Sequence, residues 1–117
     1  MLAQVNRIRI GSDYQSVVRR GVRAVGPHTV TCLRMGAADA PVRFGFIVAK
    51  NVGNAVVRNR VRRRLKAASF ALLPGVPPGT DIVFRALPSI VVAEWSDLAA
   101  ELSRGITTAL AKGQRGR

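Results

Sequence analysis

The stretch that decides the fold is strongly basic and reads KNVGNAVVRNRVRRRLK over residues 50–66. Six of the nine residues from Arg58 to Lys66 are basic, and none is acidic. If this stretch and the residues after it form a helix, at about 100° per residue, the apolar side chains share one narrow stripe. The stripe consists of Val57, Val61, Leu65, Ala68 and Leu72. We therefore predict a helix over about residues 54–72, capped by Asn54, that buries one edge and exposes a broad cationic face.

The purity of this charge is unusual for a helix that faces only water. Like charges three or four residues apart destabilise a helix by about 0.2–0.5 kcal/mol per pair. A solvated helix face normally mixes Glu and Asp with Lys and Arg, and residues 50–66 contain no carboxylate. A bound polyanion explains the pattern better. Because the planar guanidinium group binds phosphate through two hydrogen bonds, the dominance of arginine indicates a phosphate-bearing partner.

The whole chain has the same imbalance, with 19 Lys and Arg against 6 Asp and Glu and a formal net charge of +13. Such a charge indicates nucleic acid or, less often, an anionic membrane surface as the partner. A membrane-bound helix would need a strongly hydrophobic face opposite its basic one, and the stripe of Val, Leu and Ala is narrow. No apolar run approaches the roughly 20 residues of a membrane span. We expect no membrane partner.

The N-terminus and the cysteine count indicate the compartment. Residues 1–7 have no apolar stretch typical of a signal peptide. Cys32 is the single cysteine and can form no disulfide within the chain, which fits a reducing environment. We expect a cytoplasmic protein.

The other segments predict further helices and strands. A helix is expected after Ser12, with Ser12 and Gln15 as a capping box and with Tyr14, Val17 and Val18 on one face. Strands are expected over residues 28–35, 42–50 and 80–86, a stiff Pro-rich loop over 73–79, and a last helix from residue 94. The strand–helix–strand order through the basic helix indicates a parallel pair joined by a crossover.

These elements predict the α+β fold class. We expect a compact single-domain α–β sandwich, with a small sheet of about four strands, three helices and a βαβ crossover through the basic helix. At 117 residues the chain is expected to form one domain over residues 1–117. Its ordered core is expected over about residues 5–112, followed by a basic tail over 113–117.

Several short motifs follow one another in a specific order. They are NRIR at residues 6–9, SDY at 12–14, RFGF at 43–46, KNVGNAV at 50–56, VRNRVRR at 57–63, and DIVFR at 81–85 with Pro88. The set resembles the bacterial ribonuclease P protein subunit family, whose signature helix carries Arg-Asn-Arg. The resemblance spans about residues 5–112 without a large insertion. The ordered set is far more specific than an isolated Arg-Asn-Arg would be.

The resemblance implies an RNA-binding protein subunit of ribonuclease P. In that family the RNA subunit performs the chemistry, which is hydrolytic removal of the 5′ leader from precursor tRNA. The implied partners are the catalytic RNA subunit, with one protein per RNA, and precursor tRNA. The implied metal is Mg²⁺, held mainly by RNA, with none bound by the protein alone. The family also implies a left-handed βαβ crossover, against the usual right-handed rule.

The resemblance further implies two binding surfaces. The surface for the RNA subunit would consist of Lys50, Asn54, Arg58, Asn59, Arg60, Arg62, Arg63 and Lys66. The cleft for the single-stranded leader would consist of Tyr14, Val18, Cys32 and Arg43. Tyr14 matches an aromatic position where a base could stack. This chain has Val18 where the family often has a second aromatic residue, Cys32 where it often has tyrosine, and Asn51 where many members have lysine. We therefore expect weaker leader stacking and a larger contribution from backbone charge.

The residues themselves predict no active site in the protein. Neither paired carboxylates nor a metal-ligand spacing occurs among Asp13, Asp39, Asp81, Glu94, Asp97 and Glu101, and His28 is isolated in the sequence. The missing carboxylate cluster argues against a protein-only nuclease. The alternative from another class is a structural RNA-binding protein of the ribosomal type with no processing role. Copurification with one catalytic RNA or with a ribosomal particle would separate the two.

Overall fold

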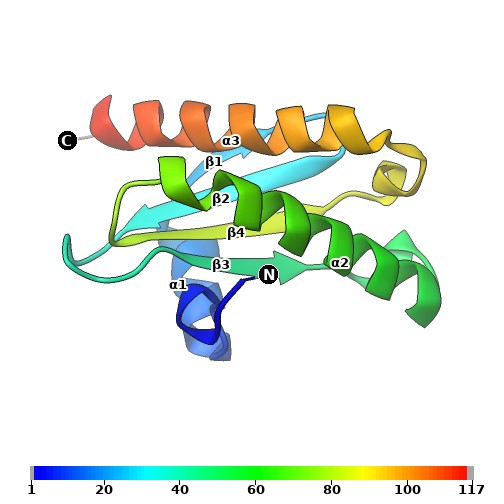
Figure 1. The fold of residues 1–117 in the computed structure, drawn as a ribbon, viewed down its shortest axis with the longest axis horizontal. Coiled ribbons are helices and arrows are strands. Elements are labelled where there is room, and N and C mark those ends of the chain that lie inside the picture. Colours follow the sequence, from blue (N-terminus) through cyan, green and yellow to red (C-terminus); the bar gives the residue numbers. More distant parts are fainter. Residues whose placement is uncertain (1, 116–117) are drawn as a thin grey trace.

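The computed structural model describes residues 2–115, which form one four-stranded sheet with three helices (Figure 1). The strands are β1 (Val22–Val25), β2 (Thr29–Met35), β3 (Arg43–Ile47) and β4 (Thr80–Ala86). The helices are α1 (Gly11–Arg20), α2 (Ala55–Leu72) and α3 (Trp95–Arg115). Short 3-10 turns are η1 (Gln4–Asn6), η2 (Lys50–Val52), η3 (Leu73–Gly75) and η4 (Pro88–Val92). The predicted α+β class is confirmed.

The sheet has the order β1-β2-β4-β3, and its one parallel pair is β3 with β4. The connection between these two strands runs through α2, so the predicted βαβ crossover is confirmed. In Figure 1, β3 and β4 both run from left to right, α2 lies in front of them, and β4 lies above β3. This arrangement is a left-handed crossover, the rare hand for such a unit.

Local interactions define α2 as its sequence predicts. The side chain of Asn54 caps the helix, with its Oδ1 accepting a hydrogen bond from the Val57 N–H at 3.0 Å. Within the apolar stripe, Val61, Leu65 and Ala68 are buried, while Val57 and Leu72 pack against the core from its border. The arginines are distributed around the rest of the helix and are exposed or half-buried. The predicted division of α2 into a buried edge and a cationic surface is therefore confirmed.

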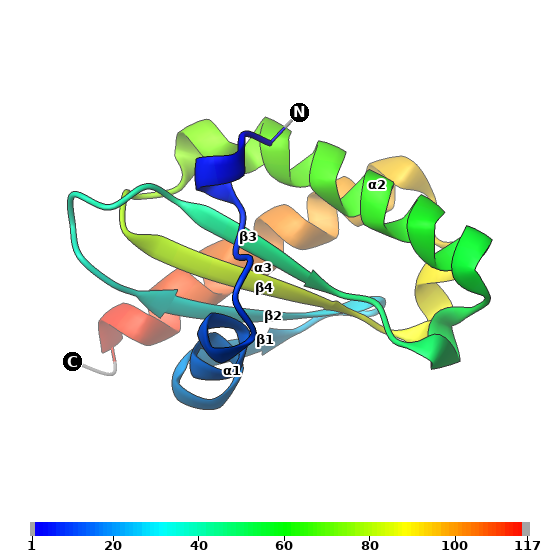
Figure 2. The same cartoon turned by 90° about the horizontal axis from the view of Figure 1, so that it is seen from below.

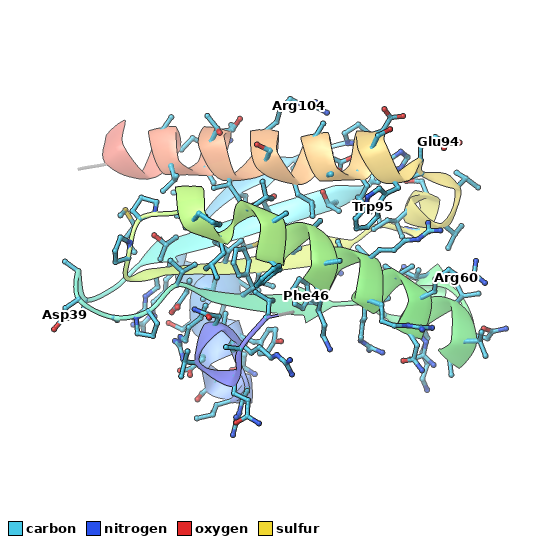
Figure 3. All side chains as sticks on the ribbon, in the orientation of Figure 1. Asp39, Phe46, Arg60, Glu94, Trp95 and Arg104 are labelled. Atoms are coloured by element: carbon cyan, nitrogen blue, oxygen red, sulfur yellow. The ribbon has the colours of Figure 1, made fainter. Side chains whose placement is uncertain are left out.

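The two faces of the sheet have cores of different size. On the face covered by α2 and α3, the rings of Phe44 and Phe84 stack with centroids 6.1 Å apart, and Phe46 stacks on Phe84 at 6.4 Å. Figure 3 shows Phe46 between β3 and α2. On the face covered by α1, the buried apolar cluster consists of Ile8, Val17, Cys32 and Val83. Figure 2 shows α1 alone on this side of the sheet, with α2 on the other.

The N-terminal half differs from the sequence prediction in two places. The helix α1 begins at Gly11 after an extended Ile10, and no side chain caps it, so the predicted capping box at Ser12 is wrong. The chain enters α1 early because the Ile8 N–H donates to the Phe44 carbonyl at 2.8 Å and holds the preceding segment on β3. Strand β1 has no counterpart among the predicted segments. It is short and forms through its pairing with β2.

Two segment ends also differ. Strand β3 ends at Ile47, before the predicted end at residue 50, because the chain turns into η2 at Lys50. The last helix continues to Arg115, so residues 113–115 of the predicted basic tail belong to α3. Residues 116 and 117 of the predicted tail lie outside the described residues.

Candidate nucleic-acid interface

Helix α2, which carries the cationic surface, extends along the outside of the molecule next to β3 (Figure 2). Asn59, Arg60 and Arg63 are exposed, while Arg58, Arg62, Arg64 and Lys66 are half-buried. Lys50 and Asn54 are exposed at the entry to the helix. All eight residues predicted to bind the RNA subunit are thus brought together at η2 and α2, with part of each side chain open to solvent. They surround the helix on more than one side.

Only some of these side chains are held by the protein itself. Arg58 Nε donates to the Gly53 carbonyl at 3.1 Å, and Arg62 reaches Asn59 Oδ1 and the Val48 carbonyl at 3.4 Å each. Within residues 2–115 both salt bridges are made by Arg43, so no carboxylate there neutralises a cation of α2. The helix therefore presents uncompensated positive charge to its surroundings.

On the opposite face, Tyr14 holds α1 against the edge strand β3. The ring lies so close to Gly45 that a Cβ at this position would be 2.5 Å from Tyr14 Cε1. The Phe46 N–H donates to Tyr14 Oη at 3.2 Å, which satisfies a donor on the open edge of the sheet. Tyr14 is half-buried, so part of its ring is still available to a ligand.

Arg43 connects three elements through its hydrogen bonds. Its Nε and Nη2 donate to the two carboxylate oxygens of Asp81 at 2.9 and 2.8 Å, and its Nη1 donates to Asp13 Oδ2 at 3.2 Å. The bidentate bond to Asp81, more than the contact with Asp13, raises the pKa of Arg43 above its ordinary value. The predicted leader residue Arg43 thus joins α1, β3 and β4, and its charge is largely compensated.

The other two predicted cleft residues differ in their exposure. Cys32 is 3% exposed and lies beneath α1 rather than on the surface, so its predicted place in the lining of a cleft is corrected. Burial raises the pKa of the Cys32 thiol above its ordinary value, and the cations of Arg23 and Arg85 partly oppose this shift. Val18 is half-buried and packs against the same cluster.

Beside α1 the sheet is only partly covered, and this surface was not among the predicted sites. The strand register places Val25, Val30, Arg85 and Ile47 in one row, with Arg23 in the next row beside Cys32. Arg23 and Arg85 are exposed, Val25 is 77% exposed, and Val30 and Ile47 are half-buried. We call these five residues the open strip. The strip combines apolar side chains with two cations. The alternation of residues 80–86 is enough to place Arg85 on the same face of the sheet as Val83. It does not show that this face is only partly covered.

Three acidic side chains, those of Asp13, Asp81 and Glu101 of α3, are held by hydrogen bonds within the fold. Asp13 and Asp81 bind Arg43. Glu101 is 4% exposed and accepts hydrogen bonds from the Thr29 hydroxyl and, at 3.0 Å, from the His28 N–H. Glu101 therefore ties α3 to the turn between β1 and β2.

The described residues, 2–115, offer neither a metal-binding cluster nor a membrane-spanning helix. No group of three His, Cys, Asp or Glu side chains in this range is arranged to hold a metal ion. No helix in the same range has the length and apolar character needed to cross a bilayer. The interface consists of cations, amides and apolar side chains.

Comparison with known proteins identifies the family of this chain. The family model described as Ribonuclease P matches residues 2–110. The chain belongs to the ribonuclease P family. A ribonuclease P protein component from Clavibacter michiganensis subsp. michiganensis is 51% identical over 110 residues, which cover 94% of this chain and 97% of that protein. One from Streptomyces bikiniensis is 42% identical over 123 residues, covering 98% of this chain and all of that protein, 100%.

Solved structures of the ribonuclease P family share the fold. The RNase P protein of Staphylococcus aureus superposes with a TM-score of 0.79 at 20% identity, covering 91% of this chain and 96% of that one. The RNase P protein of Thermotoga maritima gives a TM-score of 0.75 at 20% identity, covering 84% and 92%. The α+β architecture described above is therefore that of the RNase P proteins, and family membership supports an RNA-binding role in tRNA 5′ processing.

Proposed function

We propose that this chain binds the catalytic RNA subunit of ribonuclease P through α2 and assists that RNA in removing the 5′ leader of precursor tRNA. The observation that carries the proposal is the uncompensated charge of α2, with six basic residues from Arg58 to Lys66 and no carboxylate paired to them within residues 2–115. Family membership supports it independently. In this proposal the RNA supplies the chemistry, and the protein supplies binding energy.

The contact with the RNA subunit would be made mainly to phosphates. Each Lys or Arg that neutralises a phosphate releases a counterion, which makes binding favourable and strongly dependent on salt. Arg60 and Arg63 are suited to this role because they are exposed. Arg58 and Arg62 are partly held by backbone carbonyls, so their guanidinium groups are positioned before RNA arrives.

The leader would bind on the α1 face, along the open strip. Half-buried Val30 and Ile47 offer an apolar surface for bases, and Arg23 and Arg85 offer cations for the phosphates beside them. Tyr14 offers a ring at the border of the strip. The substrate in this proposal is precursor tRNA, and the protein distinguishes it from mature tRNA by the single strand that mature tRNA lacks.

The proposal also covers the binding of Mg²⁺, the ratio of protein to RNA and the cellular compartment. The carboxylates of residues 2–115 do not form a cluster that fits Mg²⁺. We propose that Mg²⁺ is held mainly by RNA, that one protein binds one RNA, and that the complex acts in the cytoplasm. A reducing cytoplasm agrees with the single free cysteine, Cys32.

Reconstitution with the cognate RNA subunit tests the proposal. The purified protein alone should not cleave precursor tRNA, and adding it to the RNA should raise cleavage strongly at low Mg²⁺. Arg60→Ala and Arg63→Ala should each weaken binding to the RNA subunit and lower the slope of log affinity against log salt by about 0.7–0.9. Arg104→Ala is the matched control, because Figure 3 places Arg104 on the side of α3 away from α2.

Two results would overturn the proposal. One is cleavage by protein from which all RNA has been removed. The other is an equal effect of Arg60→Ala, Arg63→Ala and Arg104→Ala on affinity and salt slope, which would mean that α2 has no special role. Copurification with ribosomal particles in place of one catalytic RNA would favour a structural RNA-binding protein instead.

A further inference from the structure

Phe70, near the end of α2, is an aromatic residue that the core does not use. Its side chain is 49% exposed, whereas Phe44 and Phe84 are fully buried. Among the described residues, neither buried cluster includes Phe70, even as a partly buried neighbour, although Phe46 and Leu72 are in that position. The residue therefore lies at the margin of the fold, with 49% of its surface open to solvent.

The position of Phe70 on the helix places it in line with the polar residues of the RNA-facing surface. Asn59, Arg63, Lys66 and Phe70 follow the spacing i, i+4, i+7 and i+11, which forms one ridge along an α-helix. At about 1.5 Å per residue, Phe70 lies about 6 Å beyond Lys66 along the axis. We call these four residues the outer ridge. It carries two cations and one amide, and it ends in an aromatic ring.

A second exposed aromatic residue shows that the surroundings of Phe70 are distinctive. Trp95, at the start of α3, is 44% exposed and has Glu94 and Asp97 beside it in the sequence. Helix α2 contains no acidic residue at all. A polyanion can approach Phe70 along a surface of one sign, whereas at Trp95 it meets carboxylates. Electrostatic complementarity therefore assigns RNA to Phe70 and not to Trp95.

We infer that Phe70 is a stacking platform for an unpaired base of the RNA that α2 binds. Arg63 and Lys66 would contact the phosphates, and the ring would cover the face of a base that is not stacked in a helix. Phosphate contacts alone position RNA without distinguishing its structure, so the ring adds selectivity for a single-stranded or bulged segment at this end of α2. The inference rests on the proposed function, because it takes the partner of α2 to be RNA.

The first test measures affinity for the RNA subunit over a series of salt concentrations. Phe70→Ala and Phe70→Leu should weaken binding by about 5- to 150-fold, the range for loss of one base–aromatic stack. Leucine keeps an apolar side chain but has no aromatic ring. Weakened RNA binding by Phe70→Leu would therefore distinguish base stacking from general hydrophobic contact. Phe70→Tyr should bind like the wild type. The salt slope should stay unchanged in all three variants, whereas Lys66→Ala should lower it by about 0.7–0.9.

The second test is spectroscopic and uses a folded, binding-competent protein. In a Trp95→Phe background, Phe70→Trp provides a single indole at the end of the outer ridge. Stacking on a base should quench its emission when the RNA subunit is added. The emission of Trp95 in the otherwise unchanged chain should vary little and is the matched control. Thermal unfolding should be close to wild type for every Phe70 variant, because the ring is not part of either core cluster.

The outcomes separate this inference from the proposed function. If Phe70→Leu binds RNA like the wild type and the indole at position 70 is not quenched, while Arg60→Ala still weakens binding, the stacking platform is refuted and the RNA-binding role of α2 stands. If Arg60→Ala also has no effect, the proposed function fails as well. A changed salt slope in Phe70→Leu would mean that the residue acts on the neighbouring cations and would also overturn the inference.

Discussion

The α2 surface and the α1 face differ in how closely binding is connected with folding. On α2, the buried residues Val61 and Leu65 lie on one edge of the helix, and exposed Arg60 and Arg63 lie elsewhere on it. On the α1 face, the side chains proposed to bind the leader also hold the fold together. Tyr14 accepts a hydrogen bond from the edge of β3 and packs against the same cluster as Val30 and Ile47 of the open strip, while Arg43 is bound to Asp81.

This difference indicates which surface can be mutated without loss of the fold. Arginines of α2 can be replaced one at a time, because their removal even relieves repulsion between like charges. A change at Tyr14 or Gly45 alters the packing of α1 on the sheet before it alters any contact with RNA. Measurements on the α1 face must therefore separate stability from binding.

The largest effect is expected within α2, where the residues buried in the core and the residues proposed to bind RNA lie on different sides of one helix. Val61→Asp places an unpaired charge at a position that is 5% exposed, and it should reduce the free energy of unfolding by about 3–5 kcal/mol. Circular dichroism during thermal unfolding measures the loss. The neighbouring change Arg60→Asp should leave the unfolding temperature nearly unchanged and affect only RNA binding. Equal destabilisation by both would show that α2 has no separate buried edge.

The second effect concerns the contact between α1 and β3. A methyl group at residue 45 would lie 2.5 Å from the Tyr14 ring, so Gly45→Ala should cost about 1–3 kcal/mol of unfolding free energy. Gly75→Ala is the matched control, because no atom lies within 4 Å of its added methyl. Combining Gly45→Ala with Tyr14→Leu should cost less than the sum of the single changes, as measured by a double-mutant cycle in urea. Simple additivity would contradict the close packing of the two residues.

The third effect separates the two roles of Tyr14. Tyr14→Ala should reduce the affinity of the holoenzyme for precursor tRNA by about 1–3 kcal/mol and change that for mature tRNA little, because a stacked leader base is lost. Tyr14→Phe keeps the ring but removes the bond from the Phe46 N–H, so it should cost about 0.5–1.5 kcal/mol of stability without changing the ratio of the two affinities. If Tyr14→Ala lowers stability and leaves that ratio unchanged, Tyr14 belongs to the fold alone.

The smallest effect is expected for the cations of the open strip. Arg23→Ala and Arg85→Ala should each lower the salt slope for precursor tRNA binding by about 0.7, the value for one phosphate of a single strand, and leave mature tRNA unaffected. Both side chains are exposed, so the fold should tolerate either change. Arg104→Ala serves as the control with the same change in net charge. A slope that falls equally for all three variants would remove the strip from the leader path.

Several features of this protein could be read from the sequence because they depend on near neighbours. The α2 helix, its cap at Asn54 and its buried Val61 and Leu65 depend on residues within one or two turns. Strand β4 occupies its predicted residues, 80–86, between a proline-rich loop and Pro88. The positive charge of α2 is likewise a local property. Periodicity, capping and charge are carried by the order of residues, so these features were predictable.

Other features were decided only by the tertiary structure, because they join residues far apart in the chain. Arg43 and Asp81 are separated by 38 positions, and nothing in either segment indicates that they form a bidentate pair. The resemblance implied that Cys32 lines a cleft, and only the packing of α1 on the sheet shows that Cys32 lies beneath that helix. The open strip exists because the ten residues of α1 cover only part of that face. Which cations are exposed there depends on which sheet surface remains uncovered, and local patterns do not encode that choice.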